Sequence, residues 1–330
     1  MSRGFDAFEI DDFRGPARDV SRSPHRDTRY EWAVARRRER IREEEARADS
    51  RDQQARDRPK GDRPPLAREE RVQMILAKRT RSDFLDRSKT YRLRDSEMHS
   101  LTEIGKFRVV ATSDLAQFAY NGDHSRMEND IANLSRQGLV KQTRIADSDH
   151  SPTRVVTLTK EGDKVLHRSN LLHCGQVTYH GLKKPKEAIH DAELYRLYHK
   201  VSDEIEGRGG KVVRVKLDYE IKRDLYAELP RAFGDKGKNP DTVKEEVARR
   251  HGLKVVDGEM QIPDMRLEYA SDPDMEIHRL DLELATEHYR PKGLAAKARA
   301  GFRIYARRGE TDRLRRVRDE HELSAAIFRL

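Results

Sequence analysis

The sequence predicts an α+β protein in which two folded units follow a charged N-terminal arm. Between residues 94 and 167, three segments with helical spacing of apolar residues precede two short β-branched segments separated by a polar loop. From about residue 184 onward, helix-like and strand-like patterns alternate, as in a domain built around a mixed sheet. Only 35% of the 330 residues are apolar and 38% are charged, so we expect part of the chain to lie outside any packed core.

The overall charge and the cysteine count narrow the classes of function. A formal net charge of +9 and a pI near 9.5 are compatible with binding to nucleic acid. The single cysteine, Cys174, excludes a disulfide framework or a thiolate-rich zinc site within one chain. No apolar run approaches the roughly 18 residues that a membrane helix needs, and the N-terminus lacks the apolar segment of a signal peptide. We therefore expect a cytoplasmic protein with no membrane partner.

Residues 1–65 are predicted to form a charged arm and linker, largely disordered or folded as a solvent-exposed helix. Residues 31–55 consist mainly of strong helix formers, with opposite charges three or four positions apart. This pattern favours a solvated, partly frayed helix over a basic arm that lies along phosphates. Residues 66–94, after a proline- and glycine-containing linker, are interpreted as an extended lead-in to the first folded unit.

Residues 95–183 carry the pattern of the first folded unit. Its expected elements are three helices that begin near Asp95, Thr112 and Asp123, two strands over residues 141–145 and 154–158, and a closing helix capped by Thr159. Three helices, a hairpin with a polar tip and a closing helix are the order of a winged helix. That fold presents its third helix to the major groove, so double-stranded DNA is the expected partner.

The polar side of the third helix supplies the candidate DNA contacts. Arginine can pair bidentately with guanine and asparagine with adenine, so Arg126, Asn129 and Asn133 are the candidates for reading bases. The full set of predicted DNA-contact residues is Ser125, Arg126, Asn129, Asn133, Arg136, Lys141, Arg144 and Arg154. Asp130 is expected at the edge of the same polar arc, where it would oppose phosphate binding. The alternative interpretation is that this arc is solvated or forms a homodimer interface.

Residues 184–330 are predicted to form an α/β domain around a small mixed sheet. Its expected elements are a helix over residues 186–206, strands over 212–217, 253–256, 259–262, 265–269 and 275–284, a helix that begins at Asp241, and a final helix over 294–305. Residues 226–241 contain two prolines and two glycines and are interpreted as a loop.

Three carboxylates in this domain form a candidate metal site. Asp281 and Glu283 alternate onto one face of a predicted strand, and Asp264 precedes a neighbouring strand. If the strands are adjacent, these side chains could hold a Mg²⁺ ion that activates water against a phosphodiester. The alternative to a metal site is a strand that simply carries acidic residues on its solvent-exposed face.

The order Pro263–Asp264 followed by Asp281-Leu282-Glu283 resembles the PD-(D/E)xK nuclease fold. In that fold a lysine follows the second carboxylate by two residues, but this chain has Ala285 there. Lys297, or else Lys292, would have to supply the cation from the following helix. The resemblance therefore implies catalytic roles for Asp264, Glu283 and Lys297 only if the domain is active, and the missing lysine favours an inactive domain.

The combination of both units resembles the replication-relaxation family of winged-helix proteins, which plasmids and conjugative elements carry. The resemblance covers about residues 95–306 and depends on the wing region and on four short C-terminal matches: His190-Asp191-Ala192-Glu193-Leu194, Pro263–Asp264, Asp281-x-Glu283-x-x-Thr286, and a helix with Lys297 and Tyr305. It implies a role in replication, transfer or gene control of a mobile element.

The sequence thus favours a sequence-selective DNA-binding protein, acting as a regulator or accessory factor without a required cofactor. One alternative is a Mg²⁺-dependent DNA endonuclease, and another is an interaction subunit that binds other proteins of a replication or transfer complex. The histidines lack the spacing of metal ligands and are interpreted as ordinary polar or capping residues; they include His167, His173, His180, His190 and His199.

Overall fold

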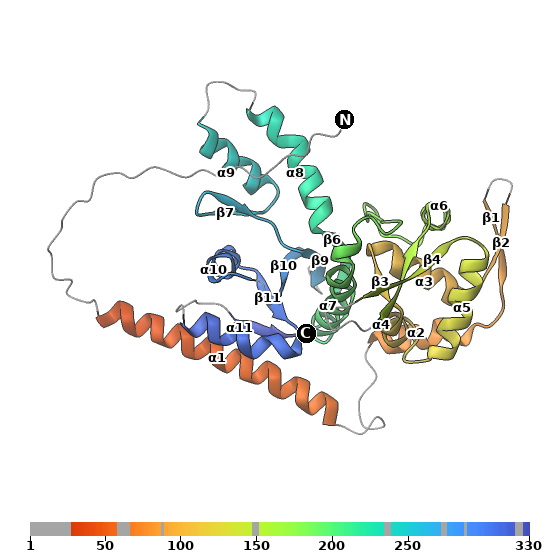
Figure 1. Ribbon diagram of the computed structural model, residues 1–330, viewed down its shortest axis with the longest axis horizontal. Helices are drawn as coiled ribbons and strands as arrows, with labels where there is room; N and C mark the ends of the chain where they lie inside the picture. The colour runs from red at the N-terminus through yellow and green to blue at the C-terminus, as the bar shows by residue number, and fades with distance from the viewer. Residues whose placement is uncertain are drawn as a thin grey trace.

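The computed structural model describes residues 28–57, 67–86, 89–146, 152–233, 239–271, 276–286, 289–320 and 326–330. The first 27 residues, the predicted linker at 58–66 and the predicted wing tip at 147–151 lie outside these ranges. The described part is a mixed α+β structure with several small sheets (Figure 1). No described helix has both the length and the apolar character needed to cross a membrane.

The N-terminal arm contains one long helix, α1 (Thr28–Asp57), which confirms the predicted helix. The expectation that it is solvated all around is wrong. Glu45 is 3% exposed and accepts hydrogen bonds from Arg318 and from the backbone of Ile327, while Asp49 contacts Arg315 at 2.6 Å. α1 therefore packs along α11 (Arg308–Glu320) and β12 (Ile327–Arg329), near the C-terminus (Figure 1).

The predicted extended lead-in is also corrected, because it contains a helix and a hairpin. Helix α2 (Ala67–Ala77) is followed by strands β1 (Ser82–Asp86) and β2 (Lys89–Leu93). Val72 and Leu76 lie one helical turn apart and are buried, as are Tyr91 and Leu93 of β2. These residues join the main hydrophobic core, so the segment is part of the folded unit.

The following elements match the expected order of a winged helix closely. They are α3 (Asp95–Lys106), β3 (Val110–Ala111), α4 (Thr112–Ala119), α5 (His124–Arg136), β4 (Val140–Ala146), β5 (Pro152–Leu158) and α6 (Lys160–Arg168). The sequence pattern missed only β3, which is two residues long and completes an antiparallel sheet in the order β3-β5-β4. This unit is called the α3–α6 unit below.

The C-terminal region is built around a five-stranded sheet in the order β12-β11-β10-β9-β6. The elements before β11 are the 3-10 turn η1 (Pro185–Glu187), α7 (Ala188–Glu206), β6 (Gly210–Leu217), α8 (Asp218–Phe233), α9 (Pro240–Arg250), β7 (Lys254–Val256), β8 (Glu259–Gln261), β9 (Met265–Ser271), β10 (Ile277–Ala285) and α10 (Pro291–Ala300). β11 (Arg303–Ala306) runs parallel to β10 and β12, whereas β9 is antiparallel to both β10 and β6.

Side-chain alternation assigns one layer of helices to each face of this sheet. Leu282 and Leu284 of β10 belong to the core that contains the apolar side of α7. Ala285 of the same strand packs with Leu294 of α10 and Leu314 of α11. Glu283 alternates with the leucines and therefore faces the side of α10.

Two predictions for this region are wrong. Residues 226–233 continue helix α8 instead of forming a loop, because Leu225 and Ile221 anchor the helix against α9 and Pro230 is tolerated near its end. The predicted final helix ends at Ala300, since Gly301 adopts a left-handed φ of 93° that terminates α10. Tyr305 consequently lies on strand β11.

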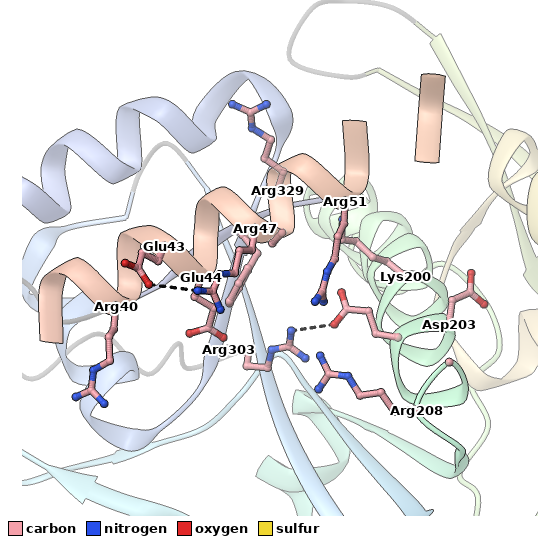
Figure 2. A pocket seen from close by; sticks show the side chains of 14 residues that line it. Arg40, Glu43, Glu44, Arg47, Arg51, Lys200, Asp203, Arg208, Arg303 and Arg329 are labelled. Atoms are coloured by element: carbon pink, nitrogen blue, oxygen red, sulfur yellow. Dashed lines mark hydrogen bonds and ion pairs between the residues drawn. The ribbon is translucent and has the colours of Figure 1, made fainter. Parts of the chain in front are cut away.

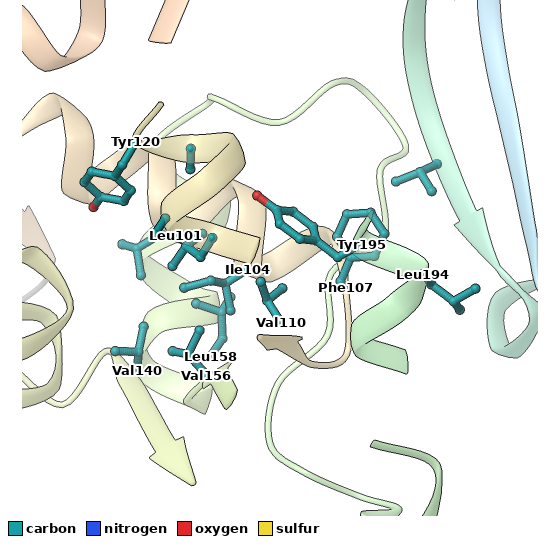
Figure 3. Packing of buried hydrophobic residues seen from close by; sticks show 14 of the residues in the cluster. Leu101, Ile104, Phe107, Val110, Tyr120, Val140, Val156, Leu158, Leu194 and Tyr195 are labelled. Atoms are coloured by element: carbon teal, nitrogen blue, oxygen red, sulfur yellow. The ribbon is translucent and has the colours of Figure 1, made fainter. Parts of the chain in front are cut away.

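The predicted domain boundary at residue 184 does not separate two hydrophobic cores. Tyr195 of α7 is fully buried and its ring lies 5.2 Å from that of Phe107, which follows α3 (Figure 3). Arg196 contacts Asp114 of α4 at 2.9 Å, and His199 contacts Glu103 of α3 at 3.1 Å. Helix α7 thus joins the α3–α6 unit to the sheet through one continuous core.

Candidate functional site

Helix α5 has one buried and one exposed side, and the exposed side is the first candidate site. The Asp123 side chain caps the helix by accepting a hydrogen bond from the Arg126 amide at 2.9 Å. Met127, Ile131 and Leu134 form the buried stripe, as predicted. The exposed positions follow each other at helical spacing and are called the α5 face: Ser125, Asn129, Ala132 and Arg136.

Three of the predicted DNA contacts interact with other residues of the protein. The Arg126 guanidinium donates to the carbonyl oxygens of Leu76 and Lys78, at 2.5 and 3.1 Å, and so holds the end of α2. The Asn133 amide donates to Glu97 at 2.9 Å. Arg154 of β5 forms an ion pair with Glu128 of α5. These side chains position neighbouring elements, and the sequence pattern gave no sign of their partners.

The predicted contacts on the wing strands differ in orientation. Lys141 and Arg144 of β4 are both exposed, but they are three residues apart and therefore point to opposite faces of the sheet. Arg144 lies directly opposite Arg154 in the strand register. Because Arg154 contacts α5, Arg144 lies on the same face of the sheet as α5.

Asp130 was expected at the edge of the polar arc, and this is wrong because the side chain is fully buried. Its carboxylate contacts the Arg94 guanidinium at 2.8 Å and accepts hydrogen bonds from the hydroxyls of Ser96 and Tyr120, at 2.5 and 3.2 Å. Asp130 therefore fixes α5 to α3 and α4 from the inside. Its charge does not face a ligand on the α5 face.

The second candidate site is a group of side chains called the carboxylate cluster: His190, Asp264, Glu283, Tyr289 and Lys297. Asp264 precedes β9, and one of its oxygens accepts a hydrogen bond from the Leu284 amide at 2.9 Å. Lys297 of α10 contacts Glu283 of β10 at 3.1 Å and donates to the Ile262 carbonyl at 2.5 Å. His190, near the start of α7, lies 3.4 Å from Asp264, and Tyr289 donates to Glu283.

Burial and the neighbouring charges together shift the pKa values of the two acids of the carboxylate cluster in opposite directions. Burial and the neighbouring charge of Asp264 raise the pKa of Glu283 to about 7. Burial also acts to raise the pKa of Asp264, but the hydrogen bond and the charge of His190 outweigh it and hold that pKa below its usual value. Burial lowers the pKa of His190, whereas its contacts with Asp264 raise it, with a net result of about 9. At neutral pH the cluster therefore contains an imidazolium paired with a carboxylate.

The structure brings together only part of the predicted metal site. Asp264 and Glu283 are neighbours, and Lys297 reaches Glu283 as the relocated cation, whereas Lys292 is exposed. Asp281 does not join them. Arg266 is its direct cross-strand partner and contacts both of its oxygens, at 2.6 and 2.8 Å. The sequence pattern identified the correct face of the strand but not the arginine that occupies it.

The donor set of the carboxylate cluster does not fit a Mg²⁺ ion as it is arranged. Within the described ranges, no group of three His, Cys, Asp or Glu side chains is placed to hold a metal ion. Both oxygens of Glu283 already accept hydrogen bonds, and two cationic groups, His190 and Lys297, stand where a divalent ion would be repelled. The residues therefore form a self-neutralised polar network.

His190 and Tyr289 are residues of the cluster that the sequence pattern missed. His190 was interpreted as an ordinary polar residue because no second histidine stands one helical turn away. Its partner Asp264 is 74 positions later, and only the pairing of β9 with β6 and β10 brings that carboxylate to the start of α7. Tyr289 follows Glu283 by six positions, and no local motif marks it.

The His190–Asp264 pair predicts a pH-dependent stability. Because the folded-state pKa of about 9 exceeds the usual 6.5 of histidine, the pair stabilises the fold fully below about pH 6.5, and this contribution is lost as the pH rises towards 9. His190 is partly exposed, so solvent screens the pair and reduces its effect. We expect the free energy of unfolding of wild type to exceed that of His190→Asn by about 1–2 kcal/mol at pH 6. Urea unfolding at pH 6, 7.5 and 9.5 measures the difference, and a gap that stays constant over this range would contradict the assignment.

Comparisons with known proteins do not identify a family. No family model and no curated protein matches the chain. One solved structure with a partial likeness is a mutant of MepR from a multidrug-resistant S. aureus clinical isolate. It is 16% identical, covers 33% of this chain and 80% of its own, and superposes with a TM-score of 0.22. At that score the likeness carries no argument about the function of this chain.

Proposed function

We propose that the protein binds double-stranded DNA through the α5 face and the adjoining strands β4 and β5, as a sequence-selective regulator or accessory factor. The observation that carries this proposal is the α5 face itself. Its other side is fixed by the core of the α3–α6 unit and by Asp130, while Ser125, Asn129 and Arg136 remain exposed. Entry into a major groove requires a helix whose buried side is fixed rigidly by the core and whose exposed side is polar.

The composition of the α5 face supports this proposal in three ways. The small side chains of Ser125 and Ala132 allow the helix backbone to approach base edges closely. Asn129 has the amide that can pair with adenine. Arg136 lies at the end of α5, and Arg144 of β4 lies on the face of the sheet where α5 is. Together they supply positive charge for phosphates on either side of the groove.

The resemblance to the replication-relaxation family extends this proposal to a biological setting. The DNA would then belong to a plasmid or conjugative element, and the protein would act in its replication, transfer or gene control. The motifs that carry the resemblance include Asp264 and Glu283, which support a nuclease-like ancestry of the C-terminal sheet without requiring cleavage.

Charge reversal tests duplex binding directly. We expect Arg136→Glu and Arg144→Glu each to weaken binding to random-sequence duplexes several-fold. Each should also reduce the slope of log affinity against log salt concentration by about one, the value for one lost phosphate contact. Fluorescence anisotropy at 50 to 200 mM salt measures both effects. Arg249→Glu, at an exposed position of α9, is the matched control. Equal affinity of all three variants and wild type would exclude this surface as the DNA contact.

A Mg²⁺-dependent endonuclease is the second candidate function, because Asp264, Glu283 and Lys297 converge as that activity would need. The strand order supports it as well, since β6, β9, β10 and β11 are adjacent and only the last pair is parallel. Two observations argue against this activity. His190 and Lys297 already neutralise the carboxylate cluster, and Arg266 holds Asp281 in an ion pair away from it.

We therefore expect no cleavage that depends on the cluster. Supercoiled plasmid is incubated with the protein and Mg²⁺ or Mn²⁺, and nicking is followed on gels. Wild type and Asp264→Ala should give the same background. Asp257→Ala, at an exposed turn, is the control variant. The endonuclease would be established instead if wild type and Asp257→Ala nick the plasmid and Asp264→Ala does not.

A further inference from the structure

A cavity of about 770 Å³ lies between α1, the C-terminal end of α7 and the strands β11 and β12 (Figure 2). Its lining shares no residue with the α5 face or the carboxylate cluster. The wall that α1 contributes is held in place from its other side by the ion pairs of Glu45 and Asp49 with α11. The volume is in the range of sites that bind small ligands, about 300–1,000 Å³.

The lining of this cavity carries an excess of positive charge. Seven basic side chains line it against four acidic ones, an excess of three. Asp203 is neutralised by Arg68 from outside the cavity at 3.0 Å, and Glu204 pairs with Arg303 at 2.9 Å. Among the described residues, Arg40, Arg51 and Arg208 form no ion pair. Positive charge in a concave surface focuses the electrostatic potential on any anion that enters.

Two of these three unpaired guanidinium groups, those of Arg51 and Arg208, converge on the same space (Figure 2). Figure 2 shows Arg51 of α1 and Arg208, just after α7, with their guanidinium groups turned towards Arg303. Arginine forks bind phosphate oxygens bidentately, which a single exposed lysine cannot do. The geometry of this part of the cavity therefore matches a phosphate or pyrophosphate group.

A smaller compartment of about 400 Å³ continues from the first. The two share Arg208, Arg303, Glu44 and Glu204, so they form one groove, which we call the arginine groove. The second compartment adds Ile205, Leu280 and the partly exposed ring of Tyr269. An aromatic ring beside an arginine pair offers a stacking surface for a nucleobase, and such stacking contributes about 1–3 kcal/mol per base.

We propose that the arginine groove binds a nucleotide, with its phosphates on Arg51 and Arg208 and its base against Tyr269. The nucleotide is either a free nucleoside polyphosphate or one end of a nucleic-acid strand, since both present the same phosphate and base. This site is separate from the α5 face and does not depend on duplex binding there.

Titration calorimetry of the full chain with ATP, tripolyphosphate and the single-stranded tetranucleotide dT4 tests the proposal. We expect saturable binding of ATP or dT4 at one site per chain, with tripolyphosphate at least fivefold weaker than the better of the two. Arg51→Glu and Arg208→Glu should each weaken that binding tenfold or more. Tyr269→Leu should weaken binding of ATP or dT4 but not binding of tripolyphosphate. Arg249→Glu, an exposed charge reversal on α9, should bind all three probes like wild type.

The outcomes separate the two sources of the nucleotide. Tighter binding of ATP than of dT4 supports a free nucleotide, and the reverse supports a strand end. Absence of saturable binding by all three probes would overturn the proposal. So would wild-type affinity in both Arg51→Glu and Arg208→Glu, whose side chains are exposed and can be replaced without disturbing the core. Equal affinity for tripolyphosphate and for the better of ATP and dT4 would overturn the assignment of the base to Tyr269.

Discussion

Replacing Asp130 with alanine is expected to destabilise the protein by about 3–5 kcal/mol, the largest effect of any single change considered. The fully buried carboxylate is the acceptor for the Arg94 guanidinium and for the hydroxyls of Ser96 and Tyr120. Its removal leaves a partly buried cation and two buried hydroxyls without that acceptor, and the cost of such unsatisfied groups exceeds the net value of the bonds. Urea denaturation followed by circular dichroism measures the loss.

Asp123→Ala is the matched control for this prediction, because it removes an aspartate from the same helix. Asp123 is exposed and only caps the amide of Arg126, so its loss should cost about 1 kcal/mol. If Asp130→Ala costs no more than Asp123→Ala, then the buried network does not hold α5 in place. The rigid presentation of the α5 face would then lose its physical basis.

The fold of the α3–α6 unit could be predicted from the sequence almost element by element, because its signals are local. Asp123 and Thr159 cap α5 and α6 as the sequence indicates, and the stripe of Met127, Ile131 and Leu134 has helical spacing. The docking of α1 could not be predicted in this way. It depends on Glu45 meeting Arg318, and nothing near either residue in the sequence marks that contact.

The candidate sites show the same division between local and long-range information. Exposure of Asn129 and Arg136 follows from helical periodicity alone. The engagement of Arg126 and Asn133 does not, because their partners lie on α2 and α3, some 36 to 50 positions away. The pairing of Asp281 with Arg266 likewise depends on the strand register, which a single sequence does not specify.

The second large effect is expected on the sequence preference of DNA binding. Asn129 and Asn133 are both on α5 and both have the amide that recognises adenine. The Asn133 amide is already bound to Glu97 and to the Arg92 carbonyl, at 2.9 and 3.4 Å, whereas Asn129 is exposed. Loss of one bidentate base contact removes about 1–3 kcal/mol of discrimination, or roughly 5- to 150-fold in relative affinity.

Selection of bound duplexes from a random DNA pool, repeated with wild type, Asn129→Ala and Asn133→Ala, tests most directly whether the α5 face enters the major groove. We predict that wild type enriches a defined motif. Asn129→Ala should lose the preference at one A·T position of that motif, and Asn133→Ala should keep the preference while lowering stability. Enrichment of the same motif with equal strength by Asn129→Ala, or of no motif by wild type, would contradict the account.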